Sequence, residues 1–253
     1  MAARSFLGAG DVYIDRVVEG VSQGLVGPIY ANKLSIQPNV EKKESTSKGR
    51  YDYGQVLESV NLQQPAELSL ELKEATGDIL TMAFLGTSAA LSAASGTMTD
   101  QARVITAVGR WYPLGHLNLA DTITVETLAT GGVVLVEGTD YRLNRPLGLI
   151  MALAGGAIDA ADTVYVTGAY DGATGTVVSG ATRTEVRCRI LFDGINQADG
   201  TQVTVDIFEA VLSADSEFDF LADDFGVVSL TGTLKTPTGQ TAPFTVTVQD
   251  AVA

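Results

Sequence analysis

The segment Pro65–Ala75 restricts the possible fold more than any other part of the chain. In its sequence, PAELSLELKEA, the apolar residues Ala66, Leu68, Leu70 and Leu72 alternate with polar ones. A period of two is typical of a β-strand with one buried face and one face in water. We therefore expect a strand here.

The same alternation occurs toward both ends of the chain, so we expect a mainly β protein. The chain also has 27 glycines and only 7% aromatic residues, which favours many turns and strands with modest side chains. The further strand positions are Leu34, Ile36 and Val40; Val203, Val205 and Ile207; Val228, Leu230 and Leu234; and Phe244, Val246 and Val248.

One short α-helix is predicted at residues 76–85. Thr76 can cap its start, and Asp78 lies in the first turn, where the helix dipole favours an acid. Ile79, Met82 and Ala83 share one face before Gly86 ends the pattern.

The middle of the chain reads as an inserted β domain. Residues 87–99 are mostly Ser, Ala, Thr and Gly, and residues 171–182 (DGATGTVVSGAT) are similar, which is typical of linkers. Between them lie short strand patterns at Val104–Val108, Ile123–Glu126, Val133–Glu137, Tyr141–Leu143, Leu147–Leu153 and Val164–Tyr170. The sequence thus predicts a domain at 1–101, continued at 175–253, and a small inserted domain at 102–174.

Residues 41–55 are predicted to form a long exposed loop or the tip of a hairpin, because they have no sustained apolar period. They carry a basic cluster, interrupted by Glu41 and Glu44 and followed by two tyrosines: Lys42, Lys43, Lys48, Arg50, Tyr51 and Tyr53. Three interpretations fit: nucleic-acid binding, docking on an acidic protein surface, or a solvated loop. We favour docking between copies of the chain.

The charge balance argues against general affinity for nucleic acid. The net charge is −14, from 30 acidic and 16 basic residues, whereas phosphate binding needs clustered basic groups. From Leu191 to Ala253 only Lys235 offsets ten acids: Asp193, Asp199, Asp206, Glu209, Asp215, Glu217, Asp219, Asp223, Asp224 and Asp250. This end of the chain should form the acidic surface that the basic cluster could meet.

The sequence favours a protein made and kept in a cytoplasm. The single cysteine, Cys188, cannot form an internal disulfide, and a reducing compartment is the simpler interpretation. The start of the sequence lacks an apolar run long enough for a signal peptide, and no stretch reaches the roughly 20 apolar residues of a membrane span.

Nothing in the sequence indicates an enzyme. The lone histidine, His116, lies in WYPLGHLNLAD without a nucleophile-elbow pattern, so we expect a loop or interface residue. Cys188 shares a strand face with Val186, Ile190 and Phe192 and should be a small buried hydrophobe. No metal or cofactor is expected.

Metal and phosphate motifs are incomplete. One histidine and one cysteine are too few for a zinc cluster. In DGINQADG, Ile195 and Gln197 occupy positions that need oxygen ligands in a calcium loop, and LADD (221–224) does not match that loop either. Gly8 and Gly10 are followed by Tyr13 where a dinucleotide motif has its third glycine.

The order of these features resembles the major tail tube proteins of long-tailed, siphophage-like bacteriophages. The resemblance rests on an N-terminal strand, a strand pair with a long polar loop, the pattern P-x-x-L-x-L-x-L from Pro65, and a helix ending in AFLG (83–86). It continues in an F-x-F element at Phe218 and Phe220 before a final S-L-x-G-x-L strand. It covers about residues 1–85 and 182–248. The inserted domain departs from the minimal pattern and looks like a small immunoglobulin-like β-sandwich, placed by analogy on the outer surface.

The resemblance implies a β-sandwich or half-barrel whose copies form hexameric rings. These rings would stack in the virion tail into a hollow conduit for DNA ejection. Its subunits would be made in the host bacterial cytoplasm. The implied partners are other copies, tail terminator, tape measure and baseplate or distal tail proteins, with no membrane contact and no specific DNA binding. The loop residues Lys42, Lys43, Glu44, Lys48, Arg50, Tyr51 and Tyr53 would bridge rings, and Glu67, Glu71, Asp206 and Glu209 are candidates for an acidic bore.

Two other functions stay open. An adhesive or carbohydrate-binding β-sandwich would need an exposed aromatic platform, and the only tryptophan, Trp111, stands beside Tyr112 in a single short run. A hydrolase would need a pair of carboxylates at a set separation, which spacing along a chain does not reveal.

Overall fold

The computed structural model describes residues 5–213, 217–223 and 225–249. The chain is mainly β, as predicted, and forms two compact units. The first unit takes in the chain up to Ser88 and again from Val178, and the second is Ala89–Val177. Three of the ten acids counted from Leu191 to Ala253, namely Asp215, Asp224 and Asp250, lie outside the described residues.

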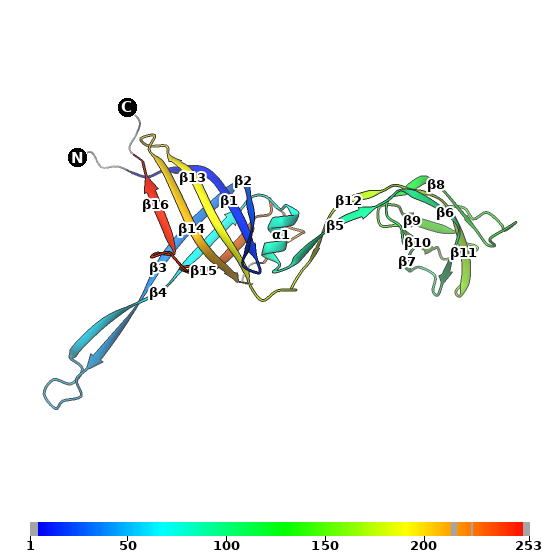
Figure 1. The fold of residues 1–253 in the computed structure, drawn as a ribbon. Coiled ribbons are helices and arrows are strands. Elements are labelled where there is room, and N and C mark those ends of the chain that lie inside the picture. Colours follow the sequence, from blue (N-terminus) through cyan, green and yellow to red (C-terminus); the bar gives the residue numbers. More distant parts are fainter. Residues whose placement is uncertain (1–4, 214–216, 224, 250–253) are drawn as a thin grey trace. The chain divides into compact units, whose positions relative to one another are not determined.

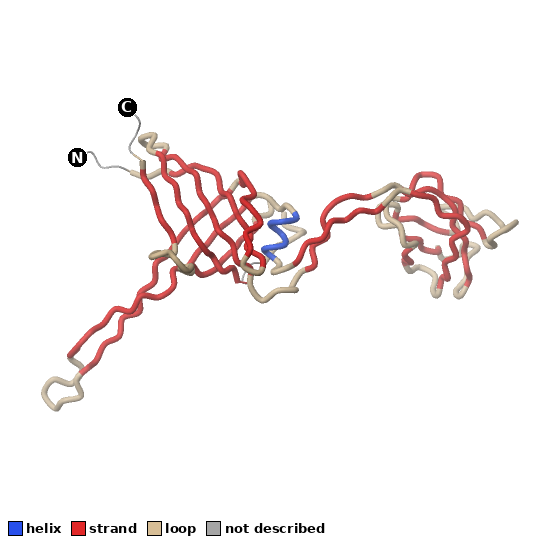
Figure 2. Tube along the Cα trace, in the orientation of Figure 1, coloured by secondary structure: helices blue, strands red, loops and turns tan. Residues whose placement is uncertain are grey.

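The first unit is built on one antiparallel sheet in the order β2-β1-β13-β14-β15-β4-β3, with β16 also paired to β14 (Figures 1 and 2). The strands are β1 (Gly8–Val18), β2 (Val21–Ile29), β3 (Ala31–Thr46), β4 (Val56–Leu72), β13 (Val186–Asn196), β14 (Gln202–Ser213), β15 (Val228–Leu234) and β16 (Phe244–Val248).

The sheet of the first unit curves around a single core. Buried side chains from β1, β13 and β14 form one cluster with those of β15, β4 and the helix. The alternation that predicted the strand in β4 is confirmed, because Leu68, Leu70 and Leu72 are all within this cluster. Burial of such side chains is the main favourable contribution to folding.

The predicted helix is confirmed as α1 (Gly77–Ala83). The Thr76 side chain accepts a hydrogen bond from the backbone N–H of Ile79, and Asp78 lies in the first turn. Ile79, Met82 and Ala83 are buried against the sheet, which is the face that their spacing indicated.

The second unit contains two three-stranded antiparallel sheets, β6-β11-β8 and β7-β10-β9, and most of a separate two-stranded sheet, β12-β5. Both three-stranded sheets contribute to one core, as in a small β-sandwich. The strands are β5 (Thr87–Ala93), β6 (Gly96–Ile105), β7 (Trp111–Pro113), β8 (Leu119–Glu126), β9 (Tyr141–Asn144), β10 (Leu149–Ala152), β11 (Asp162–Tyr170) and β12 (Ala173–Ser179).

Three local predictions differ from the structure. The predicted linker at 87–99 contains β5 and the start of β6, and the second linker contains β12, because these small side chains allow backbone pairing. The strand expected at 133–137 is reduced to the isolated bridges Glu126↔Val134 and Glu137↔Tyr141. Of the two alternatives predicted for 41–55, the structure shows the tip of a hairpin: β3 continues to Thr46, and residues 47–55 connect it to β4.

Candidate assembly surfaces

The β3–β4 hairpin extends beyond the sheet as a two-stranded ribbon. β15 pairs with β4 only between Glu67 and Leu72, whereas β3 and β4 remain paired from Asn39↔Gln64 to Thr46↔Val56. Among the described strands, none flanks this outer part on either side. We call residues 39–64 the distal ribbon; it is the long pair of strands that runs away from the sheet in Figure 1.

The distal ribbon exposes several aliphatic side chains to solvent. Leu57 is 64% exposed and Val40 63% exposed, and Val56, Val60 and Leu62 are also classed as exposed. An isolated two-stranded hairpin is marginally stable in water. A ribbon with free backbone edges and exposed aliphatic residues is therefore a surface suited to binding another chain.

The predicted bridging residues divide between the ribbon and its turn. Lys42, Lys43 and Glu44 lie in β3, where Lys42 pairs with Glu44, and Lys43 Nζ is 3.6 Å from a Glu41 carboxylate oxygen. These lysines are thus locally neutralised.

The turn at residues 47–55 carries the rest of the predicted cluster: Lys48, Arg50, Tyr51 and Tyr53. Its base is ordered by backbone hydrogen bonds, from Ser47 N to Gln55 O at 2.8 Å and from Gly54 N to Ser47 O at 2.9 Å. Tyr51 is 94% exposed and Tyr53 78% exposed. The turn therefore presents two aromatic rings in water.

The four candidate bore acids share the solvent face of the sheet, but three of them are paired with cations. Arg189 donates two hydrogen bonds to the Asp206 carboxylate, at 3.0 and 2.6 Å. Glu209 lies 3.4 Å from Arg187 and 3.7 Å from Lys235, and Glu71 lies 3.8 Å from Lys33. Glu67 has no ion pair among the described residues. This face is of mixed charge, which sequence alone did not indicate.

The sheet of the first unit ends in free edges. Among the described strands, β2 pairs only with β1, β3 only with β4, and β16 only with β14. Eight of the nine residues of β2 are exposed, including Val21, Leu25 and Val26. Unpaired N–H and C=O groups along such edges can pair with another chain.

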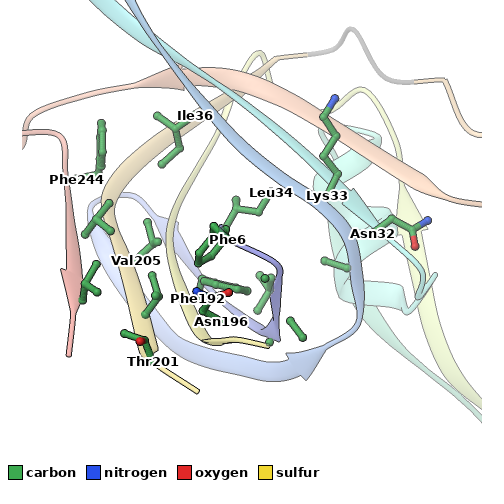
Figure 3. Close-up of a pocket in the computed structure, with 18 of the residues that line it drawn as sticks. Phe6, Asn32, Lys33, Leu34, Ile36, Phe192, Asn196, Thr201, Val205 and Phe244 are labelled. Carbon is green, nitrogen blue, oxygen red and sulfur yellow. The ribbon is translucent and has the colours of Figure 1, made fainter. Parts of the chain in front are cut away.

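A largely apolar cavity of about 860 Å³ opens inside the curve of the sheet (Figure 3). Its wall comes from the residues before β1 and from β1, β3, β13, β14 and β16. The labelled side chains Phe6, Leu34, Phe192, Val205 and Phe244 lie around it. Lys33, Asn196, Asp199 and Thr201 are among its few polar wall residues, so this cavity suits mainly apolar groups.

His116 and Trp111 both lie in the second unit. His116 stacks on Tyr170 with ring centroids 4.0 Å apart. Trp111 is in β7, and the hydroxyl of its neighbour Tyr112 accepts a hydrogen bond from Ala107 N at 2.8 Å. Within the described residues, no group of three His, Cys, Asp or Glu side chains could hold a metal ion. Helix α1 has seven residues, and no helix in the described part of the chain is long and apolar enough to span a bilayer.

Cys188 is buried on the inner face of β13, as its neighbours predicted. Burial, and next the charge of Asp15, raise the pKa of its thiol to about 12. Because the thiolate is the reactive form, we expect Cys188 in the folded protein to resist a disulfide reagent at pH 8 and to react fully in denaturant. Rapid labelling of the folded protein would contradict this burial.

The raised pKa of Cys188 also predicts how stability depends on pH. The unfolded chain loses the thiol proton near the ordinary pKa of 9.0, whereas the folded chain keeps it until about pH 12. This contribution to stability is complete below pH 9 and is lost between these two values, at up to about 1.4 kcal/mol per pH unit. Denaturant unfolding of wild type and Cys188→Ala across this window measures the difference.

Comparison with known proteins gives a family without an assigned activity. The model of the family described as "Protein of unknown function UCP028589" matches residues 5–243. No curated protein matches the chain. The match includes both units and the whole of the distal ribbon.

Proposed function

We propose that this chain, which belongs to the family of proteins of unknown function UCP028589, is a structural subunit that polymerises into the tail tube of a bacteriophage. In this proposal, hexameric rings stack into a hollow conduit for DNA. The ring size and the phage setting come from the resemblance of the sequence to major tail tube proteins. The chain acts as a building block and not as an enzyme.

The distal ribbon is the observation that carries the proposal. Its two strands extend beyond every neighbouring strand among the described residues, and they end in a turn with exposed tyrosines. A monomer gains nothing from exposing Val40, Leu57 and Val60 in this way, since such surfaces promote uncontrolled association. Contact with a stacked copy would bury these side chains and satisfy the free backbone edges.

The free edges of the first unit support lateral contacts in the same assembly. Ring closure removes the edges of a sheet by pairing each with a neighbour, and symmetric homo-oligomers are the commonest assemblies. Strands β2, β3 and β16 each have one partner, so each has an edge available for such pairing. Stacking of rings is then the head-to-tail contact that extends into a filament.

The conduit part of the proposal is electrostatic. The net charge of −14 repels phosphate on average. Glu71, Asp206 and Glu209 are ion-paired, so the proposed repulsion depends on the total charge of many copies more than on these three carboxylates. Such a bore would let DNA pass without binding it.

Electron microscopy of the purified, concentrated chain tests the proposal directly. We expect rings or hollow filaments, because only an assembly function predicts them. An adhesive or carbohydrate-binding module would remain monomeric under the same conditions. Strictly monomeric protein at high concentration, combined with absence of the chain from tail shafts of virions, would overturn the proposal.

A further inference from the structure

Two arginines far apart in the sequence meet beside the segment that follows α1. Arg16, on β1, donates a hydrogen bond from Nη2 to Gly86 O at 2.7 Å. The backbone N–H of Arg183 donates to Leu85 O at 2.9 Å. The two residues are therefore fixed to adjacent points of the chain, and both line the same two surface cavities.

Neither arginine has an ion pair among the described residues, whereas Arg145, Arg187 and Arg189 do. The Nε atom of Arg183 is buried and has no hydrogen-bond partner in that part of the chain. Burial, and next the nearby Arg183 guanidinium, lower the pKa of Arg16, with the Asp78 carboxylate opposing. Two adjacent guanidinium groups with unused N–H donors form a site for a carboxylate or a similar oxyanion.

The cavity next to this pair has a wall that is part polar and part apolar. It has a volume of about 410 Å³, with Arg16, Arg183 and Asp78 among its polar wall residues. The apolar part of its wall consists of Ile14, Val18, Val26, Ile29, Ile79 and Met82. The site therefore fits a ligand that joins a carboxylate to an aromatic or aliphatic group.

The chain itself presents such a ligand. Residues 217–223, EFDFLAD, alternate acids with large apolar side chains. Phe220 is 71% exposed and Leu221 90% exposed. The rings of Phe218 and Phe220 pack against Phe84 at centroid distances of 6.3 and 5.9 Å. No residue of this segment lines the arginine cavity of its own chain.

We propose that the cavity beside Arg16 and Arg183 in one copy binds the segment Glu217–Asp223 of a second copy. The guanidinium groups take carboxylates of the segment, and the apolar wall takes Phe220 or Leu221. The argument for this occupant is charge complementarity: the segment carries three acids and no basic residue, whereas the cavity wall carries Arg16 and Arg183 against the single acid Asp78. An arginine pair without an ion pair among the described residues and an exposed acidic, aromatic segment on the same chain therefore match. The contact rests on the proposed self-assembly and names one of its interfaces.

Fluorescence anisotropy with a labelled, end-capped EFDFLAD peptide tests this contact on the dilute, full-length chain. We expect saturable binding that Arg183→Gln weakens by at least about tenfold, or roughly 1.4 kcal/mol. Arg142→Gln is the matched control, because it removes one exposed arginine in the second unit, and its affinity should stay within about twofold. A peptide with serine in place of Phe220 and Leu221 should bind as weakly as the Arg183→Gln chain binds the original peptide.

A charge exchange makes the contact specific. A peptide in which lysine replaces Asp219 and Asp223 should lose binding to the wild type and regain it with Arg183→Glu. No saturable binding to the wild type, or equal loss in Arg183→Gln and Arg142→Gln, would overturn the contact. Circular dichroism of each variant establishes that it is folded. The peptide assay does not require the chain to polymerise. If the chain forms filaments but does not bind the peptide, only this contact is refuted. If it binds the peptide but forms no filaments, only the tail-tube proposal is refuted.

Discussion

A chain that lacks the outer part of its distal ribbon folds normally and forms no filaments. In this variant, residues 43–60 are replaced by Asn-Gly, a two-residue hairpin turn that joins Lys42 to Asn61, which face each other in the register. None of the residues removed belongs to the core of the first unit. We expect a melting temperature within a few degrees of the wild type, and loss of filaments in negative-stain micrographs.

A smaller replacement separates the ribbon from its turn. Substituting residues 48–53 by a Gly-Ser sequence removes Lys48, Arg50, Tyr51 and Tyr53 but leaves the paired strands and their exposed aliphatic residues. If the tyrosines anchor the contact, this variant also stays unassembled; if the strands do, it forms filaments more weakly. If the variant that lacks residues 43–60 still formed filaments of wild-type length, a bridging role for the hairpin would be refuted.

Sequence patterns predicted those elements whose signals are local. The period of two in β4 was readable because Leu68, Leu70 and Leu72 face one core. The helix was readable because its cap, Thr76, lies beside the residues that it stabilises. The distal ribbon was only left open as a hairpin tip, since both of its faces are in water and no apolar period marks its strands.

The arginine pair and the ion pairs on the sheet could not be predicted, because they form between residues far apart in the sequence. Arg16 and Arg183 are brought together by hydrogen bonds to the segment after α1. The Arg189–Asp206 pair depends on the register of β13 against β14. The paired strands β5 and β12 likewise form through backbone pairing. Their small residues give no compositional signal that would predict a strand.

Replacement of one core leucine should destabilise the first unit and leave the second unchanged. Leu70 is fully buried in the cluster that joins β4 to β1, β13 and α1. Leu70→Ala removes buried methyl groups and leaves a cavity, so we expect a loss of about 2–5 kcal/mol in the free energy of unfolding. Leu57→Ala is the matched control: it lies on the same strand but is exposed, and we expect a change within about 0.5 kcal/mol.

The single tryptophan allows the two units to be followed separately. Trp111 lies in the second unit, whose core shares no residue with that of the first. Far-ultraviolet circular dichroism of Leu70→Ala should show an early transition from the first unit, while tryptophan fluorescence should report a midpoint equal to that of the wild type. A matching shift in the fluorescence midpoint would mean that the units unfold together. In Leu57→Ala we expect both midpoints to stay in place, because that side chain is exposed and lies outside the core, while filament formation weakens if the distal ribbon bridges copies as proposed.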